Sequence, residues 1–189
     1  MVIDSKLYVH GGFDADKGLL ADFNCIDISE LVEEYHWTPL SNECEGEAIK
    51  LKSHTAVTHG GNIYLFGGEK NPINSSNLVF VYTPSSNQWR KVAPNIALPK
   101  MDSHAAIVHE GKMYVYGGYV PEEATYLTNM YAFDLEKETW EVYLNGSDGP
   151  NEPEGRSDFD MVEDEGAIWM FGGNNGKKNL DDFWKFSIK

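Results

Sequence analysis

Ile63-Tyr64-Leu65-Phe66-Gly67-Gly68 is a short apolar, aromatic run closed by a glycine pair, and the chain of 189 residues carries this pattern four times. The other copies end in Gly11-Gly12, Gly117-Gly118 and Gly172-Gly173, so successive pairs are 56, 50 and 55 residues apart. Repetition near 50 residues predicts an array of similar units, each of which buries its apolar faces against its neighbours.

The same succession of strands surrounds each glycine pair. A turn residue precedes the pair by six positions, an alternating segment comes before that turn in the last three copies, and a third strand follows a variable polar loop. Glycine suits such a turn because it accepts the positive φ of a tight hairpin. The turn residues are Ser5, Gly61, Gly111 and Gly166, and the fourth strands begin at Trp37, Trp89 and Trp140. Each unit is therefore predicted to be a four-stranded antiparallel meander, and no region has a sustained helical period.

The glycine pair, the aromatic third strand and the spaced tryptophan together resemble the kelch repeat. This resemblance covers the whole chain and implies an all-β fold, a kelch-type β-propeller with about 3.5 blades present. We predict one partial propeller with blades at residues 1–40, 41–93, 94–144 and 145–189. The first blade lacks most of its inner strand, and the last lacks its outer strand.

The two incomplete blades leave three explanations open. The chain is a fragment of a longer protein, a tight four-bladed ring, or an open arc completed by association through its blade edges. An open arc would expose an apolar blade face at each end. We rank the fragment first.

The chain departs from the kelch pattern on its inner strands. Kelch inner strands often begin with an arginine, and that position holds Leu51, Met101 and Arg156 here. An arginine-lined pocket, of the kind that some kelch adaptors use, is therefore not expected.

Composition narrows the function classes. Thirty acidic and fifteen basic residues give a formal charge of −15, which argues against binding to a nucleic-acid backbone. No stretch approaches the roughly 20 apolar residues of a membrane helix, and no secretory signal precedes the repeats. We predict a cytoplasmic protein with no nucleic-acid or membrane partner.

Catalytic chemistry finds little support in the sequence. No nucleophile–base pair, metal-ligand set or cofactor motif is recognised, so we expect no cofactor and no metal site. Some kelch-like propellers are enzymes, and an epimerase-like or oxidase-like site at the channel mouth remains the alternative. Arg156 is its first candidate residue.

The long loops are better candidates for recognition, because loops on a rigid scaffold carry binding residues. In a meander, the loops between the second and third strands lie on the same side as the links between blades. This side is rich in glutamate, which allows a basic partner. We predict a protein–protein interaction scaffold that binds a protein or peptide through this face. The candidate contact residues are Phe13, Glu69, Lys70, Tyr119, Glu122, Glu123, Tyr126, Arg156, Asn174 and Lys177.

Overall fold

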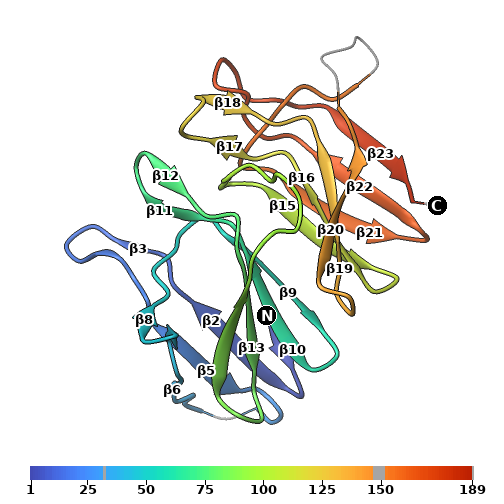
Figure 1. Ribbon diagram of the computed structural model, residues 1–189. Helices are drawn as coiled ribbons and strands as arrows, with labels where there is room; N and C mark the ends of the chain where they lie inside the picture. Colours follow the sequence, from blue (N-terminus) through green and yellow to red (C-terminus); the bar gives the residue numbers. More distant parts are fainter. Residues whose placement is uncertain (32, 147–151, 189) are drawn as a thin grey trace.

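The computed structural model describes residues 1–31, 33–146 and 152–188 (Figure 1). Residues 147–151, part of the predicted link between the third and fourth blades, lie outside these ranges. Within them all regular structure is β-strand, and four antiparallel sheets form the blades of a kelch-like propeller. The predicted all-β fold is confirmed.

Each of the four sheets is a meander of neighbouring strands. The first consists of β1 (Val2–Ile3), β2 (Lys6–His10), β5 (Phe23–Asp27) and β6 (Thr38–Pro39). The second consists of β9 (Thr55–His59), β10 (Asn62–Phe66), β13 (Val79–Thr83) and β14 (Gln88–Val92). The third consists of β15 (Ala105–His109), β16 (Lys112–Tyr116), β19 (Met130–Asp134) and β20 (Thr139–Leu144). The fourth, as far as it is described, consists of β21 (Asp160–Asp164), β22 (Ala167–Phe171) and β23 (Phe183–Ser187).

The tight turns lie at the predicted positions. Between β9 and β10 the two central residues are Gly60 and Gly61, with φ of 55° and 74°. Two consecutive positive φ values define the type I′ turn, whose twist matches that of the strands it joins. The first sheet uses Asp4 and Ser5 in the same way, which pairs the two-residue strand β1 with β2. The first sheet therefore keeps an inner strand of only two residues, in agreement with the prediction that most of this strand is missing.

Four small hairpins occupy segments that the sequence predicts to be irregular loops. Three lie between the second and third strands of a blade, and the fourth lies in the link between the first two blades. Their strands are β3 (Phe13–Asp14) with β4 (Gly18–Leu19), β11 (Glu69–Asn71) with β12 (Asn74–Ser75), β17 (Tyr119–Val120) with β18 (Thr125–Tyr126), and β7 (Glu43–Cys44) with β8 (Glu47–Ala48). Strands of two or three residues are too short to show a period of two, which is why the sequence conceals them.

The core is divided among the interfaces between adjacent blades. Side chains alternate between the two faces of each strand, so one residue set packs on the preceding blade and the next set on the following blade. Trp89 packs on Phe23 of the first blade with ring centroids 5.0 Å apart, and Trp140 packs on Phe66 of the second blade at 4.6 Å. Trp37, the third predicted motif tryptophan, is 52% exposed because no described blade lies on its side of the first sheet.

Backbone hydrogen bonds join each blade to the next. The second glycine of a pair donates its N–H to the carbonyl of the residue that enters the following blade. These bonds run from Gly12 to Leu51 (2.8 Å), from Gly68 to Met101 (2.9 Å) and from Gly118 to Arg156 (2.8 Å).

The glycine pair is required by this close approach. Gly67 has a φ of +66°, and a Cβ atom added to it would lie 2.8 Å from the carbonyl oxygen of Met101 and 2.5 Å from Cε1 of His104. Both the backbone conformation and the space at the joint therefore exclude a side chain.

Candidate functional site

The predicted loop face exists as one side of the molecule. Figure 1 shows β3, the hairpin β11–β12 and the hairpin β17–β18 in succession along the left and upper side of the molecule, opposite to the turns of the large sheets. We call this side the loop face. It also includes the loop at residues 174–180 and the described parts of the segments that link one blade to the next. It carries three groups of side chains, described in turn.

An aromatic pair stands on the third blade. Tyr119 and Tyr126 lie opposite each other in the hairpin β17–β18, and their ring centroids are 4.9 Å apart at an angle of 44°. Cross-strand aromatic pairs of this kind hold two short strands together. Both rings are half-buried, so each keeps a surface that a partner can contact.

A groove of about 560 Å³ lies beside this pair, between the third and fourth blades. Tyr126 and Lys177 both line it, and the rest of the lining consists of Ala124, Thr125, Glu154, Gly155, Asn175 and Gly176. The structure thus brings together two of the predicted contact residues that are 51 positions apart in the chain. Asn174, a third predicted residue, lies at the base of the same loop and donates a 2.8 Å bond from Nδ2 to Oδ1 of Asn179.

Polar contacts order the fourth-blade wall of this groove. Asn175 donates a hydrogen bond from Nδ2 to Glu154 at 2.5 Å, and Nζ of Lys178 lies 3.3 Å from the same carboxylate. These hydrogen bonds hold the pKa of Glu154 below its usual range, so the carboxylate is charged at neutral pH.

A second group connects the first two blades through Lys52, which is not among the contact residues predicted from the sequence. Nζ of Lys52 lies 5.0 Å from the ring centroid of Phe13 and 3.0 Å from the carboxylate of Glu69. Phe13 and Glu69 are both predicted contact residues, and Phe13 is 60% exposed. Because Lys52 is 39 positions from Phe13, only the packing of blades reveals that it links them.

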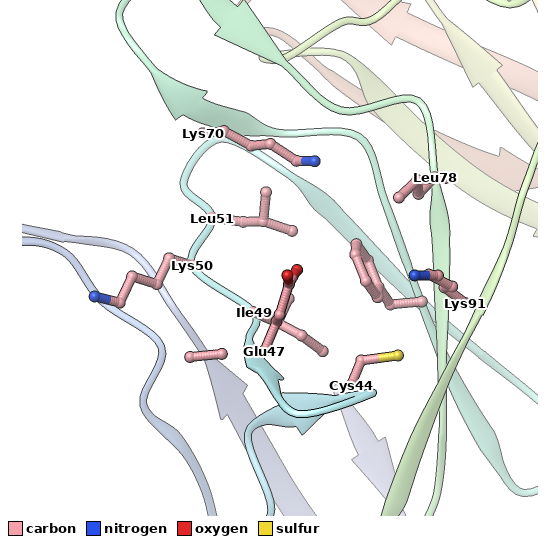
Figure 2. A pocket seen from close by; sticks show the side chains of 10 residues that line it. Cys44, Glu47, Ile49, Lys50, Leu51, Lys70, Leu78 and Lys91 are labelled. Carbon is pink, nitrogen blue, oxygen red and sulfur yellow. The ribbon is translucent and has the colours of Figure 1, made fainter.

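The third group is a pocket of about 270 Å³ between the hairpin β7–β8 and the second blade (Figure 2). Its lining contains one predicted residue, Lys70. The others are Cys44, Glu47, Ala48, Ile49, Lys50, Leu51, Leu78, Phe80 and Lys91. The one signal in the sequence that could have revealed its wall is Glu45-Gly46, whose φ values of 56° and 81° turn the hairpin.

The acidic character of the loop face is partly neutralised. Glu122 lies 3.0 Å from Nζ of Lys100, and Glu45 lies 2.5 Å from Nζ of Lys91. Glu123, the other predicted glutamate of the β17–β18 hairpin, is exposed. A partner therefore meets fewer bare carboxylates than the sequence suggests.

Arg156 lies in the interior. Its side chain is fully buried, and Nη1 and Nη2 donate hydrogen bonds of 2.6 and 2.8 Å to the two carboxylate oxygens of Asp182. Nη1 also donates to the carbonyl of Gly172 at 2.8 Å. The guanidinium thus ties the entry of the fourth blade to its glycine pair, and presents no surface to a partner or substrate.

Three successive blades each carry a histidine with a shifted pKa: His10 and His104 are buried, and His54 is half-buried. Burial lowers the pKa of His10 and of His104 to about 3, and that of His54 to about 4. The rings of His10 and His54 are 5.2 Å apart, and Nε2 of His104 lies 2.8 Å from Oγ1 of Thr55. No three His, Cys, Asp or Glu side chains of the described residues are arranged to hold a metal ion.

The comparisons with known proteins agree on the repeat. A family model described as the KLHDC2/KLHL20/DRC7 Kelch-repeats domain matches residues 53–189. Kelch-like protein 40 of Xenopus tropicalis is 26% identical over 196 residues, which covers 97% of this chain and 29% of that protein. Kelch-like protein 41b of Danio rerio is 26% identical over 148 residues, covering 73% of this chain and 23% of that protein. The chain spans less than a third of the length of these relatives.

A solved structure supports the architecture. The structure of YjhT superposes with a TM-score of 0.73 at 19% sequence identity, covering 99% of this chain and 64% of that one. At this identity the likeness concerns the fold. No helix within the described ranges has the length and apolarity needed to cross a membrane.

Proposed function

The chain belongs to the kelch-repeat family, and we propose that it is an interaction scaffold whose loop face binds a protein or peptide partner. Kelch-like proteins are in general protein-binding, which supports the class of function. The cytoplasm is the compartment that we propose for it. No catalytic role is part of the proposal.

One observation carries the choice of face. Tyr126, whose ring packs on Tyr119, lines the 560 Å³ groove together with Lys177 of the next blade. A half-buried tyrosine beside a recess is typical of the residues that dominate binding energy at interfaces, because it offers a large rigid surface at low entropic cost. The overall charge of −15 further favours a partner with a basic region, through faster encounter.

The test compares proteins captured by wild type and by variants of the loop face, followed by affinity measurement with a partner so identified. Tyr126→Ala should weaken binding by at least about tenfold, as expected for a central aromatic contact. Reversal of charge at Glu122 and Glu123 should slow association with a basic partner.

Glu136→Lys is the matched control. Glu136 is exposed in the turn between β19 and β20, on the opposite side of the molecule. A partner that loses affinity equally for this variant, or that binds Tyr126→Ala as tightly as wild type, would place the interaction elsewhere.

A further inference from the structure

The pocket beside the hairpin β7–β8 has an apolar floor and a charged rim. Ile49 and Leu51 of the first blade link form one part of the floor. Leu78, which directly precedes β13, and Phe80 of β13 form the other part. Figure 2 shows Lys70 and Lys91 on two sides of this floor, with Lys50 extending away from it and the carboxylate of Glu47 between them. The combination suits a ligand that is apolar at its centre and anionic at its edges.

The pocket exists because one repeat position holds a small residue. Leu51, Met101 and Arg156 accept the same backbone hydrogen bond from the preceding blade, so they fix a common register for the three links. Three positions earlier, the links hold Ala48, Leu98 and Pro153. Leu98 is 6% exposed and belongs to the apolar cluster between the second and third blades, whereas Ala48 is exposed and lines the pocket.

The two lysines of the rim, Lys70 and Lys91, differ in their ion pairing. Among the described residues, Lys70 shares its lack of an ion pair with Lys6, Lys17, Lys50 and Lys177. Lys52, Lys100, Lys112, Lys137 and Lys178 each lie within 3.3 Å of a carboxylate. The described part of the chain provides no such partner for Lys70, and Lys91 is held by Glu45, whose side chain is 63% exposed. An anionic group that enters the pocket would find one free ammonium group and a second whose own partner is exposed to solvent.

We propose that this pocket binds a short segment of a partner protein in which one apolar side chain is flanked by carboxylates. The apolar side chain occupies the space above Phe80 that Leu98 fills in the next link, and the flanking carboxylates lie against Lys70 and Lys91. Glu47 opposes this binding by like charge. The inference rests on the proposed function and adds a second recognition chemistry to it, because the rest of the loop face is suited to basic partners.

The experiment uses the full chain and three labelled synthetic peptides in fluorescence anisotropy titrations at low salt. The peptides are Asp-Glu-Leu-Glu-Asp, the same peptide with serine in place of leucine, and Lys-Lys-Leu-Lys-Lys. The first should bind at least about tenfold more tightly than either of the others, because it alone combines apolar burial with favourable charge. Equal binding of the leucine and serine peptides, or no binding of the first peptide, would overturn the proposal.

Three variants localise the binding. Ala48→Leu should weaken the acidic leucine peptide by about tenfold, since it places in the first link the residue found in the second. Lys70→Glu should weaken it by about fivefold, and Glu47→Gln should strengthen it by about threefold. Lys6→Glu makes the same charge change at an exposed site outside the pocket and should leave the affinity within about twofold. Unchanged binding to both Ala48→Leu and Lys70→Glu would contradict the site.

The two proposals fail in distinguishable ways. A partner that loses affinity for Tyr126→Ala, together with no binding of the acidic leucine peptide, supports the tyrosine groove and refutes the pocket. Peptide binding that depends on Ala48 and Lys70, with no partner sensitive to Tyr126, does the reverse. Lys70 and Glu47 are both exposed, so their variants keep the test valid even if Ala48→Leu disturbs the hairpin.

Discussion

The guanidinium of Arg156 and the carboxylate of Asp182 form a two-pronged ion pair inside the fourth blade, with N–O distances of 2.6 and 2.8 Å. In the second blade the same two repeat positions hold Leu51 and Leu78, because the carbonyl of Leu78 accepts from Gly67 the hydrogen bond that Asp182 accepts from Gly172. Leu51 and Leu78 belong to one apolar cluster. An apolar pair in the second blade and an ion pair in the fourth therefore occupy the same repeat positions.

The ion pair predicts that replacing Arg156 and replacing Asp182 will lower the stability of the protein by unequal amounts. Arg156→Met should lower the free energy of unfolding by about 3 kcal/mol, and Asp182→Leu should cost more, because it strands a fully buried guanidinium. The double variant should be more stable than Asp182→Leu alone. Urea unfolding of the three variants measures the coupling, and strictly additive losses would mean that the two residues do not act as a pair.

The glycine pair predicts a second contrast. Gly61→Ala and Gly67→Ala both place a side chain at positive φ, with values of +74° and +66°. A Cβ at Gly61 meets no heavy atom within 4 Å, whereas one at Gly67 overlaps Met101 and His104. We expect a loss of about 1 kcal/mol for Gly61→Ala, from strain alone, and of at least about 3 kcal/mol for Gly67→Ala. Similar melting temperatures for the two variants would show that the joint between blades is looser than described.

The buried histidines predict a loss of stability in mild acid. The pKa of His10 and of His104 is about 3 in the folded chain and about 6.5 when unfolded, so the unfolded state takes up protons first as the pH falls. The contribution of these two histidines to stability is therefore constant above about pH 6.5 and declines below it, by about 1.4 kcal/mol per pH unit for each of them until the pH nears 3.

His10→Phe tests this with a residue that the second blade carries at the same repeat position, Phe66. Its stability between pH 6 and pH 4 should fall less steeply than that of wild type by about 1.4 kcal/mol per pH unit. Denaturant titrations at several pH values give both slopes. Parallel slopes for the two proteins would assign the acid sensitivity to other groups.

The outer face of the fourth sheet predicts self-association. Phe171 and Phe183 are 59% and 63% exposed there, with no described blade to cover them. Light scattering should show a mean mass that rises with concentration, and Phe183→Lys should suppress the rise. Ile73→Lys changes an equally apolar residue at an exposed loop tip and should have little effect. A constant monomer mass would mean that the exposed face is tolerated.

The sequence predicted the blades well because their signals are local. A glycine pair, a turn residue six positions earlier and a tryptophan are each demanded by the conformation or packing of a single repeat, so their spacing identifies the strands. The small hairpins escaped because their strands are too short for a period. The grouping of loop residues could not be predicted, because it depends on contacts between blades, as the position of Lys52 between Phe13 and Glu69 shows.

Arg156 illustrates the same limit at one residue. An arginine in a mostly acidic chain was expected at the surface, facing a partner or a substrate. Its burial depends on the ion pair with Asp182, 26 positions later, and no pattern within the repeat predicts that these two residues meet. Sequence spacing locates a residue on a strand, but the partner that neutralises it is visible only once the blade is assembled.

The joints between blades are made by an amide and a carbonyl of the main chain, which almost every residue type can supply. The carbonyl belongs to Leu51 in one blade, to Met101 in the next and to Arg156 in the third. A mutation can therefore replace the side chain at this position by one of a different type while the backbone hydrogen bond between the blades is kept. Neighbouring blades of one propeller are thus free to diverge from each other without losing the arrangement that keeps them in line.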